Sequence, residues 1–305
     1  MVSKNRNASQ TNNDDGTGNS LTILVVHTDP AAPAIVGTLT DARNLFGAYG
    51  VVASGTHAYV ASQGCLTGQS CPDKTVGNAF AVIDVANPAA PALGAVLHNN
   101  ALPAPWAGTG ALSHVTSVAV SGSYAYVTAS YSDRLTVIDI ANPAAPTIVA
   151  SLRDTTNLDF PVDVQVRGQF AYVADQGTNP SHPQLTVVNV ANPASPAIAG
   201  SLTDPLQGGA YRVALSGPFA YIAGSSSTAV SAIDVSNPAA PVLDGSVYDP
   251  TAFWHTTGLA LDTTGHLVVS SPDLKSQPFQ IYPPFPGQPG TPRRPGRSPW
   301  SRSTR

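Results

Sequence analysis

The sequence contains few charged residues, and this scarcity limits the partners that suit it. Only 10% of its 305 residues are Asp, Glu, Lys or Arg, against about a quarter in an average soluble domain. The net charge is −4, yet residues 283–305 carry five arginines and no acid, so residues 1–282 are more acidic still. Nucleic-acid binding requires a basic surface that neutralises phosphates. The composition therefore argues against a nucleic-acid partner.

Long apolar runs are also missing. No run of 18 or more apolar residues occurs, so no membrane span is predicted. Residues 1–20 have no apolar segment typical of a signal peptide, and we expect them to be a disordered polar leader. Residues 283–305 are rich in Pro and Arg and are expected to be a disordered tail. The folded part is therefore predicted to span residues 21–282.

Cysteine is scarce, with Cys65 and Cys71 the only two. They lie close together in a predicted long loop, which favours a local disulfide; two free thiols are one alternative, and a metal site, with no further ligands nearby, is the other. A disulfide indicates an oxidising compartment. We therefore expect an extracytoplasmic protein (secreted, periplasmic or at the cell surface), although no signal peptide is visible.

What the sequence does have is a ten-residue repeat. The stretch "VIDVANPAAP" at Val82–Pro91 returns in similar form at Val137–Pro146, Val187–Pro196 and Ala232–Pro241, and in a diverged copy at Leu24–Pro33. An Asn before a Pro is driven away from the helical region, and Asp and Asn side chains accept hydrogen bonds from turn amides. We therefore expect Asp84, Asp139 and Asp234 to stabilise turns rather than to form a ring of ligands.

Each copy of the motif sits among four predicted strands. Residues 115–152 divide into "SVAV", "YAYVTA", "LTVIDI" and "TIVASL", each rich in β-branched or aromatic residues and bounded by Gly, Ser, Asn or Pro. Ser121–Gly122 predicts a tight hairpin between the first two, and Pro146 predicts an edge position for the last. The aromatic column Tyr59, Tyr126, Tyr172 and Tyr221 predicts a core between repeats. The pattern indicates four-stranded antiparallel meanders, the blades of an all-β propeller.

The repeats resemble the LVIVD-repeat family of β-propeller proteins. The family's "YAYVAD" strand appears as "HAYVAS", "YAYVTA", "FAYVAD" and "FAYIAG", and its "LVIVDVSNP" strand as "FAVIDVANP", "LTVIDIANP", "LTVVNVANP" and "VSAIDVSNP". The resemblance covers about residues 21–282. It implies the fold and little chemistry, because family members are mostly uncharacterised surface or secreted proteins.

The ends of the repeat region predict how the ring closes. Four complete copies of the four-stranded repeat begin near Tyr49, Val115, Pro161 and Ala210. Before them, the N-terminus supplies only the last two strands of a further copy, and after them the C-terminus supplies only the first two. Joining these halves predicts five blades, with one closing blade shared by the two chain ends. The alternative is six blades, one of them incomplete, in which "FQIY" at Phe279–Tyr282 is a third C-terminal strand.

Candidate binding residues come from aligning the starts of the innermost strands. One column holds Gly47, His114, Phe160 and Gly209, and His255 joins it if the last copy carries two extra residues. A second column, three positions on, reads Gly50, Ser117, Asp163, Arg212 and Gly258. The predicted channel-mouth residues are His114, Asp163, Arg212, His255, Tyr49 and Tyr211.

These residues admit two interpretations. A metal or acid–base site requires them to converge, whereas isolated histidines at strand ends are mostly solvated loop residues. We expect Asp163 and Arg212 to form a salt bridge between blades. The long loop around Trp106 is a further candidate for partner binding.

The sequence shows no P-loop, dinucleotide fingerprint or nucleophile elbow. It therefore favours a non-catalytic propeller that binds a protein or carbohydrate, with no cofactor or metal. One alternative is a structural subunit that forms homo-oligomers or fibres through its terminal half-blades. Another is a metal-assisted hydrolase, lyase or lactonase that uses His114, Asp163 and His255.

Overall fold

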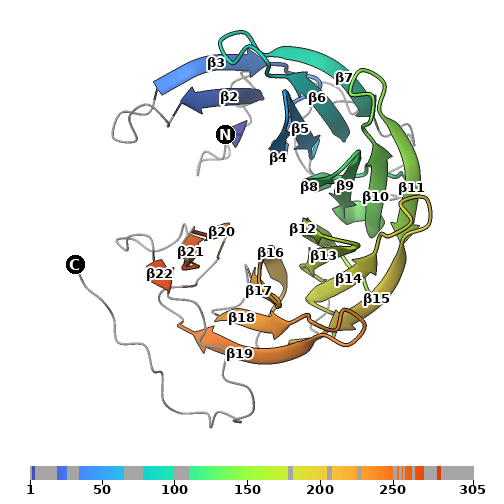
Figure 1. Cartoon of the computed structure of the whole chain (residues 1–305), viewed down its shortest axis with the longest axis vertical. Helices are drawn as coiled ribbons and strands as arrows, with labels where there is room; N and C mark the ends of the chain where they lie inside the picture. The colour runs from blue at the N-terminus through green and yellow to red at the C-terminus, as the bar shows by residue number, and fades with distance from the viewer. Residues whose placement is uncertain are drawn as a thin grey trace.

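The computed structural model describes residues 2–3, 19–25, 34–64, 78–98, 110–177, 181–204, 208–224, 229–249, 253, 256, 258–262, 265–270 and 280–282. These residues form six antiparallel sheets arranged around a central axis (Figure 1). Four sheets have four strands and two have three, and a short 3-10 helix covers Ser130–Ser132. Within this part of the chain no helix has the length and apolarity needed to cross a membrane.

The four complete sheets are the predicted blades. Blade 1 comprises β4 (Ala48–Ser54), β5 (His57–Ser62), β6 (Ala79–Asp84) and β7 (Ala92–His98). Blade 2 comprises β8 (Val115–Ser121), β9 (Tyr124–Ala129), β10 (Arg134–Asp139) and β11 (Thr147–Arg153). Blade 3 comprises β12 (Pro161–Arg167), β13 (Phe170–Asp175), β14 (Leu185–Asn189) and β15 (Ala197–Leu202). Blade 4 comprises β16 (Ala210–Ser216), β17 (Phe219–Gly224), β18 (Ala229–Asp234) and β19 (Val242–Tyr248).

Each blade runs from the axis outward in chain order. The first strand lies nearest the axis and the last lies at the rim, as β4 and β7 do in blade 1 (Figure 1). The first two strands join through a tight turn, with Gly122 at φ 57° in blade 2, a backbone conformation that glycine adopts without steric cost. The predicted meander is therefore confirmed.

The repeated motif forms the turn between the third and fourth strands. In blade 1 the Asp84 carboxylate accepts a hydrogen bond from the Ala86 amide at 2.8 Å, and the Asn87 side chain accepts one from the Ala89 amide at 3.2 Å. The other three blades repeat both bonds at the equivalent positions. These side chains satisfy backbone amides that would otherwise lack partners, which is the structural role predicted for the motif.

Apolar side chains from neighbouring blades form the core. Tyr59 stacks on Phe80 with ring centroids 5.9 Å apart, and both pack in one cluster with Val118 and Val127 of blade 2. The tyrosine column is between 2% and 4% exposed, as a core role requires; its members are Tyr59, Tyr126, Tyr172 and Tyr221. Each blade therefore buries its faces against its neighbours, as expected for a stack of repeats.

The two ends of the chain form separate three-stranded sheets. The N-terminal sheet consists of β1 (Val2–Ser3), β2 (Ser20–Val25) and β3 (Ala34–Thr40). The C-terminal sheet consists of β20 (Gly258–Leu261), β21 (Leu267–Ser270) and β22 (Gln280–Tyr282). They lie on the two sides of the ring's opening (Figure 1).

The predicted shared closing blade is therefore wrong, because β2 and β21 belong to different sheets. The "FQIY" segment instead supplies β22, which pairs with β21 from Val269↔Gln280 to Leu267↔Tyr282. A strand that follows β21 closely loses less loop entropy on pairing than one at the far end of the chain. The described residues form six sheets, as in the alternative prediction, but both terminal sheets have three strands instead of four.

Several sequence predictions fall outside the described residues. Cys65, Cys71, Trp106 and His255 are among them, as is the tail at 283–305. Of the predicted leader, Val2–Ser3 pairs with β2 as β1, and Asn19 and Ser20 adjoin or begin β2.

Candidate functional site at the channel mouth

The residues that precede the inner strands share an unusual backbone conformation. The φ angle is 65° at Gly47, 57° at His114, 58° at Phe160 and 135° at Gly209. Positive φ is strained for a residue with a side chain, so His114 and Phe160 are held there by their surroundings. This end of the inner strands is called the channel mouth below.

His114 is packed into the wall of the channel mouth. Its ring stacks on Tyr131 with centroids 3.9 Å apart, and its Nδ1 lies 3.2 Å from the Gln63 side-chain nitrogen. Its backbone amide donates to the Asn78 side chain at 2.7 Å. With an exposed fraction of 3%, His114 joins blade 1 to blade 2, and these contacts support a structural role for it.

Asp163 links three inner strands. Its Oδ1 accepts a hydrogen bond from the Ser117 hydroxyl of β8 at 2.7 Å, and its Oδ2 accepts one from the Val213 amide of β16 at 3.0 Å. Burial raises the pKa of the Asp163 carboxyl, whereas the charge of Arg212 and these hydrogen bonds act in the opposite direction. The carboxyl therefore ties blades 2, 3 and 4 together at the axis.

The expected salt bridge between Asp163 and Arg212 is not formed. Neither residue takes part in an ion pair within 4 Å in the described part of the chain. The carboxylate oxygens are directed instead to Ser117 and Val213, which are donors on the flanking inner strands. The sequence column placed the two residues at the same level of the channel, but it did not specify which way their side chains turn.

Arg212 lies instead beside two tyrosines that contact each other. Its guanidinium carbon is 4.8 Å from the Tyr211 ring centroid and 5.6 Å from that of Tyr49. The two rings meet edge to face at 6.4 Å, although Tyr49 belongs to blade 1 and Tyr211 to blade 4. The structure thus brings three of the predicted site residues together, and we call them the Tyr–Arg–Tyr cluster. All three side chains are partly exposed.

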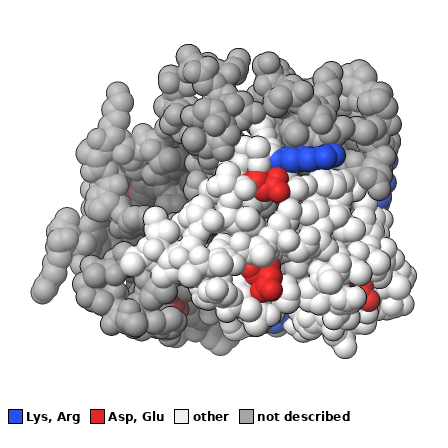
Figure 2. All heavy atoms as spheres, turned by 90° about the horizontal axis from the view of Figure 1, so that it is seen from above, with Lys and Arg blue, Asp and Glu red and all other residues white. Residues whose placement is uncertain are grey.

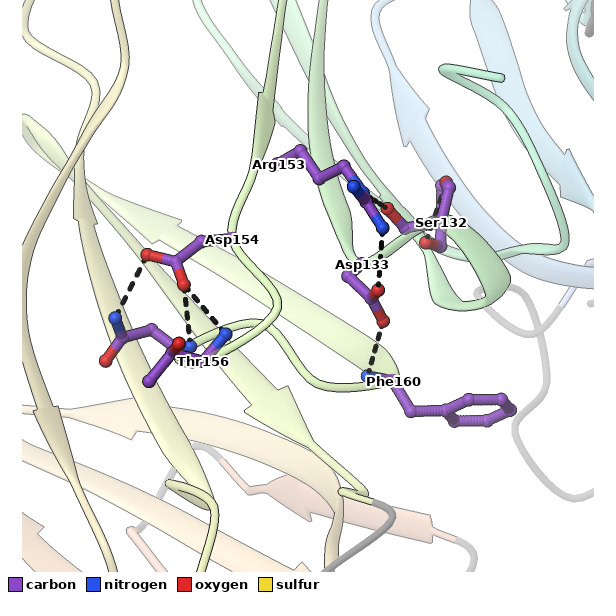
Figure 3. A network of polar contacts seen from close by, with 8 residues as sticks. Ser132, Asp133, Arg153, Asp154, Thr156 and Phe160 are labelled. Carbon is purple, nitrogen blue, oxygen red and sulfur yellow. Dashed lines mark hydrogen bonds and ion pairs between the residues drawn. The ribbon is translucent and has the colours of Figure 1, made fainter. Parts of the chain in front are cut away.

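A second polar group, not predicted as a site, lies between blades 2 and 3. The His182 Nδ1 is 2.9 Å from the Asp159 carboxylate. Asp133 forms an ion pair with Arg153 at 3.7 Å and accepts a hydrogen bond from the Phe160 amide at 3.4 Å (Figure 3). This group places several carboxyls around the connection that leads into β12.

Asp175 is the most buried carboxyl of this group. It is fully buried, and neither of its oxygens has a hydrogen-bond partner within 3.5 Å. Burial raises its pKa well above the usual range and the charges of Asp159 and Asp133 raise it further, although the Thr186 hydroxyl lies near enough to lower it. Asp175 therefore holds its proton to a higher pH than an exposed aspartate does.

One signal in the sequence pointed to this position. Asp175 ends the "FAYVAD" strand, where the other three blades have Ser62, Ala129 and Gly224. Only this blade therefore carries an ionisable group there. Within the described residues, no group of three or more His, Cys, Asp or Glu side chains is arranged to hold a metal ion.

The fold is that of a β-propeller. The chain aligns with a candidate 6-phosphogluconolactonase of Bacteroides uniformis at a TM-score of 0.64 and 16% identity, covering 87% of this chain and 74% of that one. It aligns with the periplasmic gluconolactonase of Pseudomonas aeruginosa at a TM-score of 0.56 and 15% identity, covering 77% and 70%. These likenesses show the fold alone.

The sequence model of the LVIVD repeat matches residues 75–96, 113–154, 162–204 and 207–249. These four matches fall on the four complete blades. The chain belongs to the LVIVD-repeat family. A search among curated proteins finds no match to it.

Proposed function

We propose that the protein is a non-catalytic binding scaffold that works outside the cytoplasm and holds a glycan or protein ligand at its channel mouth. The observation that carries this proposal is the Tyr–Arg–Tyr cluster, in which Tyr49 and Tyr211 of non-adjacent blades contact each other and Arg212 lies beside both rings.

The chemistry of the cluster suits recognition. Tyrosine rings offer a flat apolar face with a polar hydroxyl, and an arginine offers several fixed donors. Each of the three is carried on an inner strand, β4 or β16, rather than on a loop. Side chains on such rigid elements are positioned before the ligand arrives, which lowers the entropic cost of binding.

The outer edge of the ring carries few charges. Figure 2, which views the ring from this side, shows isolated acidic and basic side chains among uncharged residues. The extracytoplasmic location is supported by the two cysteines of the chain and by a propeller of the same fold that is named as periplasmic.

The test is a binding screen against immobilised glycans and surface proteins, followed by titration of the best ligand with variants. Tyr49→Ala and Tyr211→Ala should each weaken binding by about ten-fold or more. Tyr248→Ala is the matched control, because Tyr248 lies 65% exposed on the rim strand β19. Equal affinities for all four proteins would place the ligand elsewhere.

A lactone hydrolase is the second candidate, favoured by the close contact of His182 with Asp159, whose charge acts in turn on the buried carboxyl of Asp175. A histidine oriented by a carboxylate is able to act as a general base. Two of the structural neighbours are named for gluconolactonase activity. Hydrolysis of gluconolactones that His182→Ala abolishes would establish this function, and an unchanged rate would refute it.

A further inference from the structure

Arg212 keeps most of its hydrogen-bonding capacity. Its Nη1 donates to the Tyr211 carbonyl oxygen at 2.9 Å. A guanidinium has five N–H donors, and this is the one hydrogen bond that Arg212 donates within the described part of the chain. Its guanidinium carbon lies 4.8 Å from the Tyr211 ring centroid and 5.6 Å from that of Tyr49, and its remaining donors form no hydrogen bond within the described residues.

Arg212 forms no ion pair within 4 Å with a described carboxylate. The ion pairs of the described residues are Arg153–Asp133, His182–Asp159 and His266–Asp262. The charge of Arg212 acts on the Asp163 carboxyl, but the two oxygens of that carboxyl accept hydrogen bonds from Ser117 and Val213. A partly exposed guanidinium that lies beside two aromatic rings and keeps open donors is able to bind an anion.

We propose that the ligand of the channel mouth is an acidic sugar, whose carboxylate pairs with Arg212 while its ring packs on Tyr49 or Tyr211. This inference rests on the proposed binding function and narrows its ligand class. A planar carboxylate matches the two parallel N–H donors of a guanidinium, whereas a lysine offers a point charge without that geometry. Tyrosine rings beside the guanidinium suit the apolar face of a pyranose ring.

The probe is a short oligosaccharide of galacturonic acid, titrated calorimetrically at pH 7 and low salt. Its fully methyl-esterified form is the matched ligand, because it keeps the sugar rings and loses the charge. The acid should bind about 10- to 100-fold more tightly than the ester, the range expected for charge-assisted hydrogen bonds. Raising the salt concentration should weaken the acid alone.

Variants test whether Arg212 causes the preference for the acid over its methyl ester. Arg212→Gln should abolish the preference for the acid, and Arg212→Lys should retain only part of it. Arg167→Gln is the control, because Arg167 also lies over a tyrosine, with its guanidinium carbon 5.3 Å from the Tyr172 ring centroid, but at the opposite end of its inner strand. Matching unfolding temperatures would show that the variants fold.

The outcomes separate this inference from the binding function. Equal binding of acid and ester that Tyr49→Ala weakens would overturn the acidic-sugar inference and leave the binding function intact. Binding of the acid that Arg212→Gln leaves unchanged would also overturn it. Failure of the acid to bind at millimolar concentration would refute uronic acids as the ligand class, while the wider ligand screen would decide the binding function.

Discussion

Two aspartates near the same inter-blade connection have opposite acidities. Asp154 is partly exposed, and although burial alone would raise its pKa, hydrogen bonds from Asn157 and Thr156 outweigh that effect and lower it (Figure 3). Asp175 is fully buried, and its pKa is raised well above the usual range. Burial therefore decides the charge state where hydrogen-bond donors are lacking.

The pKa of Asp175 predicts how stability depends on pH. In the folded state the Asp175 carboxyl keeps its proton at pH values where it has lost that proton in the unfolded state. Its contribution to the free energy of unfolding is therefore fully present below about pH 4 and is lost as the pH rises. The Asp175→Asn variant cannot ionise at this position. As the pH rises above about 4, we expect its unfolding free energy to increase relative to that of the natural protein by up to about 1.4 kcal/mol per pH unit. Urea unfolding from pH 4 to pH 8 measures this difference.

Asp154→Asn is the control with the opposite sign. Because the pKa of Asp154 is lowered in the fold, its contribution is present above the unfolded pKa and is lost as the pH falls through the folded one. This variant should be the less stable protein at pH 7 and should approach the natural protein near pH 3. A parallel pH profile for the two variants would contradict the assigned pKa directions.

Replacing the glycine at the channel mouth of blade 4 by alanine should destabilise the fold more than the same replacement in a hairpin. Gly209 has φ 135°, and a methyl group added there would overlap with the Gln176 carbonyl oxygen. Gly122 also has positive φ, but nothing lies within 4 Å of such a methyl group. Gly122→Ala should cost about 1 kcal/mol and Gly209→Ala about 3 kcal/mol or more of unfolding free energy. Equal losses in urea unfolding would disprove the close approach.

At the scale of the element, the repeated turn predicts which substitutions it tolerates. Asn189 takes the place of the aspartate in blade 3, yet it accepts the same hydrogen bond, from the Ala191 amide at 2.9 Å. Asp139→Asn should therefore change the unfolding free energy by less than about 0.5 kcal/mol, whereas Asp139→Ala should cost about 1 kcal/mol. Thermal unfolding of both variants measures this, and a large loss in Asp139→Asn would show that the charge itself matters.

The strands were predictable because their signals are local and repeated. "YAYVTA" alternates apolar and small residues between turn residues, and the four complete blades begin within one residue of the predicted starts. The site was predictable only in part. The alignment placed Tyr49, Tyr211 and Arg212 at one end of the inner strands, because chain position along a strand sets the level in the channel.

The direction in which each side chain turns was not predictable. Asp163 binds donors on β8 and β16 rather than Arg212, and that choice depends on contacts between blades that are far apart in sequence. The position of Asp175 was visible as a departure from the repeat, but its loss of hydrogen-bond partners became apparent only when the blades were packed together.

At the scale of the whole molecule, the two terminal sheets hold complementary parts of one blade. The ladder between β2 and β3 shifts register between Ile23 and Leu24, as the last two strands of blade 3 do between Val187 and Val188. The ladder of β20 and β21 starts at Gly258↔Ser270, a position equivalent to Arg212↔Ala223 in blade 4. The sequence argument for a shared blade thus identified the halves correctly and failed on their pairing.

This arrangement predicts a gradient of local stability along the ring. The pairing of β1 with β2 spans two residue pairs and that of β21 with β22 spans three, whereas the equivalent ladder in blade 2 spans six. In repeat proteins each unit is stabilised by its neighbours, so units with short ladders at the ends open most readily. Hydrogen exchange followed by mass spectrometry should show fast exchange in β2, β3 and β20–β22 and slow exchange in β9 and β13.

Slow exchange in both β2 and β21 would contradict this prediction and would mean that the two ends pair in solution. If that protection depends on protein concentration, the two ends pair between different chains, which would support assembly into oligomers through the terminal half-blades. If it does not, the two ends pair within one chain and close the ring.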